Sequence, residues 1–315
     1  MIRYIIKRVL LMIPVILGVT WIIFTIMHFT PGDPAVIILG TEVSEDLLEA
    51  KRVELGLNRS YLAQFLDYLK DVFLHFDLGT SYVNGKSVSA EIFQRFPYTF
   101  RVASLSVCIS LLIGIPLGVV AAVNQYSWKD NASMTVALVG ISMPGFWVGQ
   151  MLSLLFALTL GWLPASGVGG PQYYILPCLA IGLSGCASIA RQTRSSMLEV
   201  IRQDYIVTAR AKGVIENKVI YGHGLRNALI PVITQAGSSF GIQLGGALVS
   251  ETVFSIPGLG TYMMTAISSR DYPAIQGAVI YVAIIFGLVM LVVDLLYAFI
   301  DPRIKAQYSG KRRRK

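Results

Sequence analysis

The stretch GAVIYVAIIFGLVMLVVDLLYAFI, residues 277–300, decides the class of fold. It contains a single charged side chain, Asp294. A helix of about 20 apolar residues crosses the roughly 30 Å hydrocarbon core of a bilayer. The whole chain shares this character, since 54% of its 315 residues are hydrophobic and 14% are charged, against about 25% charged in a typical soluble domain. The composition excludes a disordered chain, argues against an ordinary soluble enzyme and predicts an all-α, polytopic membrane protein.

Six stretches are long and apolar enough to be membrane-spanning helices: residues 9–29, 98–123, 132–160, 173–190, 228–249 and 277–300. The third is overlong and contains Pro144, so we expect it to tilt, to kink or to run past the membrane. The first follows three basic residues, as a signal peptide would, but its apolar run is too long and no small-residue cleavage site follows. We therefore expect it to remain as a membrane anchor.

Basic residues set the predicted orientation. With both termini in the cytoplasm, the inner segments 1–8, 124–131, 191–226 and 301–315 hold 18 of the 26 lysines and arginines. Most of the others lie in one long outer loop, and long loops count little in the positive-inside rule. We predict a multi-pass protein of a bacterial or archaeal cytoplasmic membrane. The net charge of +8 then reflects topology rather than nucleic-acid binding.

The long loop is predicted to form a small extracytoplasmic helical domain. Its residues 30–97 carry a net charge of −4. Ser44 can cap a helix that ends at Gly56, and apolar residues recur at helical spacing from Tyr61 to Phe76. The predicted organisation is an N-terminal transmembrane helix (1–30), this cap (31–97), a membrane core with a cytoplasmic loop at 191–226 (98–300) and a basic tail (301–315).

Two spans carry unusual polar or small residues. In the fifth, Gly237, Gly241 and Gly245 recur every four residues and predict close approach of another helix. Its polar side chains are costly against lipid and predict either interhelical hydrogen bonds or a polar pathway. Together with the residues around Pro144, they give the predicted pathway set: Ser142, Met143, Pro144, Phe146, Trp147, Gln235, Ser239 and Gln243.

Several isolated side chains in the spans favour structural roles. Gly114 and Gly118, in the second span, are four residues apart like the glycines of the fifth span. For Asp294 we weigh a proton relay against a structural ion pair and favour the pair. Cys108, Cys178 and Cys186 lack metal-ligand spacing and are expected to be buried core residues.

The cytoplasmic stretch from Glu199 to Pro231 is the most informative. It predicts two short helices broken at Gly213, with alternating charges and exposed apolar residues at Val200, Ile201, Tyr205 and Ile206. A solvated linker has no need of apolar residues among its charges. The pattern indicates a docking element for a cytoplasmic partner.

This stretch resembles the coupling loop of ABC-importer permeases. Asp204-Tyr205, then Thr208 to Gly213, then Leu225 to Ala228 and Pro231 carry the likeness, in the form of the dipeptide/oligopeptide/nickel branch. The general family pattern has Glu-Ala-Ala, where this chain has Val207 and Thr208 before Ala209, and it has Pro where Arg226 stands. Further matches run the whole length: residues 31–34, 77–81, 142–147, 194–198, 251–260, 270–273 and 301–303.

The resemblance implies the first permease subunit of an importer, with the type I importer fold. It implies a sister permease, two ATPase subunits that bind ATP and Mg, and an extracytoplasmic substrate-binding protein, with no cofactor and no catalytic residue in this chain. The residues expected to couple to the ATPase are Glu199, Asp204, Tyr205, Thr208, Ala209, Arg210, Ala211, Lys212, Gly213, Arg226 and Asn227. Those expected at an outer gate are Glu251, Pro257, Gly258, Arg270 and Asp271.

Other functions fit the sequence less well. The segment GTSYVNGKS at 79–87 is one residue too long for a phosphate-binding loop. Gly182-Leu183-Ser184-Gly185 has the form of a rhomboid-type serine site, but none of the three histidines lies mid-span to activate it. A secondary transporter or channel needs no ordered docking loop. The expected substrate is a small peptide, with nickel, a nickel chelate or a glutathione-like molecule as the alternative, and no metal-ligand cluster is visible.

Overall fold

The chain is described by a computed structural model that covers residues 2–300, and the basic tail lies outside the described residues. The described part is helical, with one isolated β-bridge between Thr80 and Ser87. The α-helices are α1 (Ile2–Phe29), α2 (Pro34–Leu39), α3 (Glu45–Glu54), α4 (Tyr61–Leu74), α5 (Val88–Val123), α6 (Trp128–Ser142), α7 (Gly145–Leu152), α8 (Ile175–Ile201), α9 (Asp204–Ala211), α10 (Leu225–Gly246), α11 (Leu248–Val253), α12 (Leu259–Ser269) and α13 (Tyr272–Ile300). Two π-helical segments (Ser153–Thr159, Lys218–Gly224) and a 3-10 turn (Pro171–Tyr174) complete the described elements.

Within residues 2–300, four helices are long and apolar enough to cross a membrane, or five if the bent pair α6 and α7 is one span. The four are α1, α5, α8 and α13. The fifth predicted stretch is helical, as α10, but its Gln, Ser and Gly residues keep it outside this set. The all-helical membrane fold is confirmed, and the count of six spans stays a prediction.

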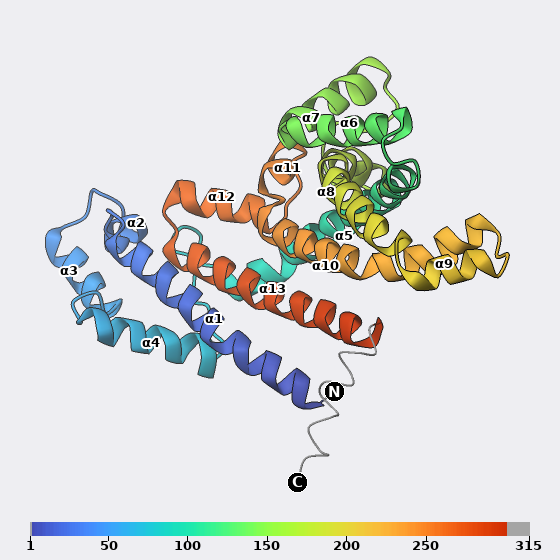
Figure 1. Cartoon of the computed structure of the whole chain (residues 1–315). Helices are drawn as coiled ribbons and strands as arrows, with labels where there is room; N and C mark the ends of the chain where they lie inside the picture. Colours follow the sequence, from blue (N-terminus) through green and yellow to red (C-terminus); the bar gives the residue numbers. More distant parts are fainter. Residues whose placement is uncertain (1, 301–315) are drawn as a thin grey trace, which may run out of the picture.

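The third predicted span is sharply bent at Pro144. Helices α6 and α7 meet at 96°. Met143, which precedes the proline, is extended (φ −89°, ψ 130°) because the proline ring disfavours helical backbone in the residue before it. The bend sets the two helices roughly at right angles, and both lie beside α8 at one end of the molecule (Figure 1). The predicted kink is therefore confirmed.

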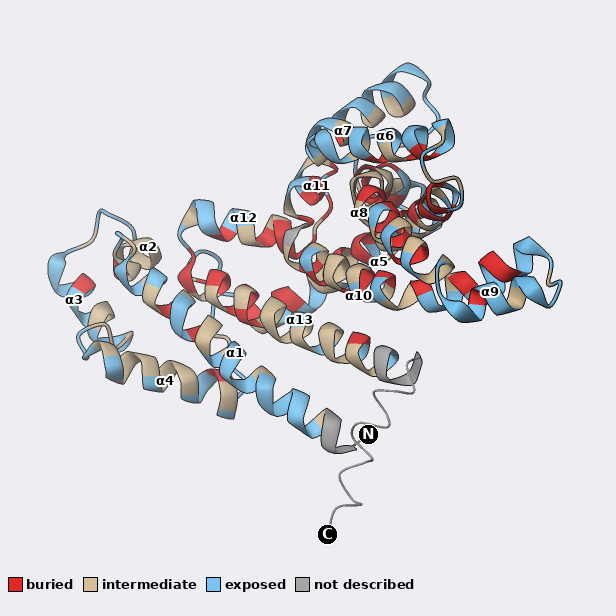
Figure 2. Cartoon of the chain, in the orientation of Figure 1, coloured by how far each residue is buried: buried red, intermediate tan, exposed pale blue. Residues whose placement is uncertain are grey.

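Helices α5 and α8 form the central pair of the bundle, where the buried residues concentrate (Figure 2). Small residues make the close contact possible. A Cβ on Gly114 would lie 2.7 Å from the carbonyl oxygen of Cys186, and one on Gly118 would lie 2.5 Å from that of Ala190. These glycines therefore serve helix packing.

We expect Gly118→Ala to lower the thermal unfolding midpoint of the purified protein. Its Cβ meets backbone, which cannot rotate away, and overpacking of this kind costs about 1–3 kcal/mol. Gly18→Ala is the matched control, since a Cβ there meets nothing within 4 Å. An equal midpoint for the two variants would contradict the packing role of Gly118.

Helix α10 packs against α13 through the predicted glycine stripe. A Cβ on Gly237 would meet Val293, and one on Gly241 would meet Phe286. Next to Val293 on α13, Asp294 pairs with Arg8 of α1 at 2.9 Å. The structural reading of Asp294 is therefore confirmed.

The cysteine prediction is confirmed in part. Cys178 and Cys186 are buried, whereas Cys108 is exposed on α5. The expectation for Cys108 was wrong because α5 turns this position, like Leu105 and Leu112, away from the rest of the chain.

The cap between the first two spans consists of α2, α3 and α4. Ser44 stands at the N-cap of α3, as predicted, but its side chain forms no capping hydrogen bond. The helix ends at Glu54, two residues before Gly56 with φ +69°. Arg52 binds the carboxylates of three acidic residues of the cap, Asp33, Glu45 and Glu49. The cap is therefore held by its own ion pairs and lies beside the outer end of α1 (Figure 1).

Candidate functional site

The loop between α8 and α10, predicted to be cytoplasmic, forms a helical hairpin. Helix α9 ends in a turn at Gly213, whose φ of +76° favours glycine, and the chain returns through the π-helical segment into α10. The Asn227 side-chain amide donates to the Tyr205 hydroxyl at 2.7 Å, and Arg210 pairs with Glu216 at 2.7 Å. The two predicted helices and the break at Gly213 are present.

The Arg210–Glu216 pair fixes the turn electrostatically. Hydrogen bonding to Glu216 raises the pKa of Arg210 further, and hydrogen bonding to Arg210 lowers the pKa of Glu216. Both side chains therefore stay charged at neutral pH. Because the pair is solvent-exposed, it contributes little to stability and mainly orients the turn.

Apolar residues divide between the inside and the outside of this hairpin. Ile206 is 1% exposed and packs inside, which corrects the expectation that it is exposed. The return segment, with the buried Val219 and Ile220, covers that side of α9. Four other apolar or aromatic residues of the hairpin are exposed, and we name them the hairpin patch: Tyr205 and Val207, which flank Ile206 on α9, and Ile215 and Tyr221 on the return segment.

The hairpin patch overlaps only in part with the residues predicted to couple to an ATPase. Sequence reasoning included Tyr205 and missed Val207, Ile215 and Tyr221, although an apolar residue among charges was the available signal. Most predicted coupling residues lie on α9 and its turn. Glu199 lies apart, in a hollow of about 840 Å³ between α6 and α8 that Arg191 and Arg202 also line.

The predicted pathway residues form two groups. The first is exposed at the α6–α7 bend: Ser142, Met143, Pro144, Phe146 and Trp147. The second, Gln235, Ser239 and Gln243, is half-buried on α10. In the described part of the chain the α10 group forms no side-chain hydrogen bond to another helix, and the Gln243 Oε1 atom is buried without a donor.

Glu251 of α11 forms the centre of a buried knot of hydrogen bonds, just after the C-terminal end of α10. Its carboxylate accepts hydrogen bonds from the Thr99 hydroxyl (2.6 Å) and the Thr261 backbone N–H (3.1 Å). Thr99 in turn accepts from the Leu259 N–H at 2.8 Å. A Cβ on Gly258 would lie 2.4 Å from the carboxyl group. Burial raises the pKa of Glu251.

Asp271, another predicted gate residue, holds the loop between α4 and α5. Asp271 is buried and accepts hydrogen bonds from the Ser81 hydroxyl and the Tyr82 backbone N–H. Burial and the nearby Asp271 raise the pKa of Tyr82 to about 12. Arg270 is exposed with φ +56°, at the turn that ends α12. Glu251 and Asp271 are thus internal braces and present no charge to the surface.

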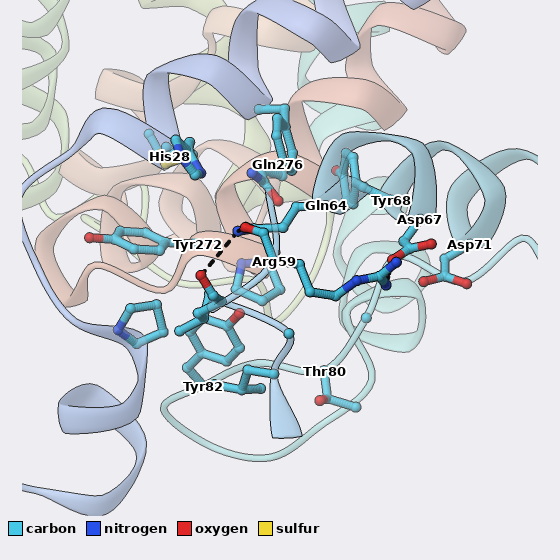
Figure 3. Close-up of a pocket in the computed structure, with 18 of the residues that line it drawn as sticks. His28, Arg59, Gln64, Asp67, Tyr68, Asp71, Thr80, Tyr82, Tyr272 and Gln276 are labelled. Carbon is cyan, nitrogen blue, oxygen red and sulfur yellow. Dashed lines mark hydrogen bonds and ion pairs between the residues drawn. The ribbon is translucent and has the colours of Figure 1, made fainter. Parts of the chain in front are cut away.

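A cavity of about 590 Å³ lies between the cap and the bundle (Figure 3). Its wall comes from the end of α1, the cap, the loop after α4 and the start of α13. Figure 3 shows Gln64, Asp67 and Asp71 of α4 along one side and Tyr82 below. The cavity was not foreseen from the sequence, because its walls are far apart along the chain.

The Gly-Leu-Ser-Gly segment at residues 182–185 has a structural explanation. The Ser110 hydroxyl donates to the carbonyl oxygen of Gly182, and a Cβ on Gly185 would meet that hydroxyl. The Gly-x-Ser-Gly segment therefore packs α8 on α5. In the described residues no group of three or more His, Cys, Asp or Glu side chains could hold a metal ion.

The chain is similar over most of its length to known membrane transport proteins. Residues 114–306 match the family model "Binding-protein-dependent transport system inner membrane component", and residues 1–103 match the model of the N-terminal part of such membrane components. The chain is 44% identical to the dipeptide transport system permease protein DppB of Alkalihalophilus pseudofirmus, over 97% of this chain and 100% of that protein. It is also 44% identical to the glutathione transport system permease protein GsiC of Salmonella typhimurium, over 97% and 99%.

A solved structure supports the fold. The inward-facing MetNI methionine ABC transporter gives a TM-score of 0.58 at 16% identity, over 67% of this chain and 96% of the solved chain.

Proposed function

We propose, since this chain belongs to the family of binding-protein-dependent transport system inner membrane components, that it forms half of the translocation pathway of an ABC importer for dipeptides and oligopeptides. Family membership makes it a membrane-spanning, non-catalytic subunit that works with ATPase and substrate-binding partners. We further propose one sister permease, two ATPase subunits that bind the ATP and Mg, and cytoplasmic termini.

The hairpin patch supports the coupling role. It is apolar, exposed and set on a hairpin whose turn is fixed by Gly213 and the Arg210–Glu216 pair. A partner that covers such a patch gains apolar burial without reorganising the hairpin. The ATPase subunit is the partner of a cytoplasmic loop in this kind of transporter.

Substrate is inferred from the relatives. One transports dipeptides and another glutathione, and both substrates carry peptide-like amides with a free ammonium and carboxylates. This common chemistry favours a peptide over nickel or a nickel chelate.

The proposed substrate is tested by uptake into vesicles that contain the whole transporter with its own binding protein. We expect ATP-dependent uptake of labelled dipeptide. Glutathione and nickel are the comparison substrates, and empty vesicles are the control. Uptake of nickel or of glutathione with no dipeptide uptake would contradict the assignment.

The pathway is tested by cysteine substitution at both pathway groups in the assembled transporter. We expect Met143→Cys and Gln243→Cys to react with a water-soluble thiol reagent at rates that change between nucleotide-free and ATP-bound states, because alternating access opens the path to one side at a time. Leu112→Cys, on an exposed apolar position of α5, serves as the control. Rates that do not respond to nucleotide at both positions would contradict the placement.

A further inference from the structure

Helix α4 of the cap packs against a membrane-spanning helix. The ring of Phe24 in α1 lies 5.6 Å from that of Tyr61, 5.2 Å from Phe65 and 5.5 Å from Tyr68. The Tyr61 and Thr25 hydroxyls are 2.7 Å apart. One face of α4 is therefore fixed beside the outer third of α1, as the two neighbouring helices in Figure 1 show.

A second face of α4 is apolar and lacks a partner in the described chain. Leu62 is 66% exposed and Leu66 is 60% exposed. Leu69 and Phe73, half-buried, continue the same side at helical spacing. We name these four residues the α4 stripe. Phe76, just beyond the helix, adds a ring that is 82% exposed. A contiguous apolar strip of this kind on a water-facing surface is uncommon and marks an interaction site.

The third face of α4 is polar and faces the cavity. Gln64, Asp67 and Asp71 line it, together with groups from the loop after α4 (Figure 3). The Arg59–Asp67 ion pair lies on this side. Around its axis, α4 thus meets protein on one side and a polar cavity on another, and on the α4 stripe Leu62 and Leu66 stay exposed. This three-way division is the pattern of a helix that lies at a boundary between water and an apolar phase.

The depth of α4 identifies that apolar phase. Phe24 contacts three residues of α4, so α4 lies level with residues 21–29 of α1. At that level α1, itself a candidate span, exposes Trp21, Ile22 and Ile26, each more than half exposed. These side chains have to face lipid in a membrane-spanning helix. Lipid therefore reaches the level of the α4 stripe.

We propose that the α4 stripe lies in the outer leaflet of the bilayer, with lipid acyl chains as its occupant. The cap is then a membrane-seated domain that holds its polar cavity at the lipid–water boundary. This inference does not depend on which substrate the transporter carries.

The test is collision-gradient electron paramagnetic resonance on the assembled transporter in lipid vesicles. A nitroxide is attached to Leu62→Cys or to Leu66→Cys in a background without Cys108, Cys178 and Cys186. Asp71→Cys is the matched control, since it is exposed on the same helix but on the cavity side. Molecular oxygen concentrates in hydrocarbon, and the nickel complex NiEDDA stays in water.

We expect the ratio of oxygen to NiEDDA collision rates at both stripe positions to exceed that at Asp71 several-fold. Low accessibility to both reagents would mean that a protein, such as the binding protein or the sister permease, covers the stripe. A ratio equal to that at Asp71 would mean that water covers it. Either result would overturn the proposal, and uptake measured on the same vesicles shows that the labelled transporter is intact.

Discussion

Val207→Asp should leave the protein folded and abolish ATP-driven uptake. Val207 is 56% exposed on the hairpin patch, so a carboxylate there costs little in the folded chain. Under the proposed docking of the hairpin patch on an ATPase subunit, the same carboxylate leaves water without a partner charge, which is costly. Residues at the centre of an interface contribute about 2 kcal/mol or more, which is about a 30-fold change in affinity.

The measurements are uptake, ATP hydrolysis and copurification of the ATPase subunits. We expect uptake to fall at least as far as copurification, while the thermal unfolding midpoint stays that of the wild type. Val53→Asp is the matched control, since the valine is 53% exposed on the cap. Normal uptake by Val207→Asp would show that the hairpin patch is not the coupling surface. A fall with both variants would show a general effect of the substitution.

The sequence predicted the helices well wherever membrane chemistry dictates them. The apolar run 277–300 lies within α13, and Pro144 marks the break in the third stretch. Helix α5 instead begins at Val88, ten residues before the predicted start. Its polar first turns stay helical because Glu91 and Arg95 form an ion pair one turn apart. Apolar composition alone cannot reveal helix that extends beyond the bilayer.

Side-chain environment was less predictable than helix position. Ile206 and Val207 are neighbours with similar side chains, yet Ile206 is buried and Val207 exposed. The difference depends on which side of α9 the return segment covers, and no local pattern encodes that. The contact between Thr99 and Glu251 joins residues 152 positions apart. A sequence marks both side chains as polar but does not pair them.

The second large effect is expected from the buried knot around Glu251. Glu251→Ala should lower the thermal unfolding midpoint of the protein and reduce uptake. The substitution leaves the Thr99 hydroxyl and the Thr261 N–H without their acceptor in a buried place, and each orphaned group costs about 1–3 kcal/mol. Gly258→Ala should act alike, because its Cβ would occupy the position of the carboxyl group. Thr252→Ala, a neighbouring exposed position, is the control. Thermal unfolding and uptake are the measurements.

Glu251 also predicts a pH dependence. Burial raises its pKa above the ordinary value of 4.5. A group whose pKa is raised in the folded state stabilises that state fully below its unfolded pKa, and this stabilisation is lost as the pH rises through the folded pKa. The contribution of Glu251 to the unfolding midpoint should therefore decline as the pH rises above its unfolded pKa, and the wild type should lose stability relative to a variant that cannot ionise there. Glu251→Gln retains one acceptor oxygen and cannot ionise, so its profile should be flatter over the same range. Parallel profiles for the two proteins would show that Glu251 does not titrate in the folded state and that the knot acts through its hydrogen bonds alone.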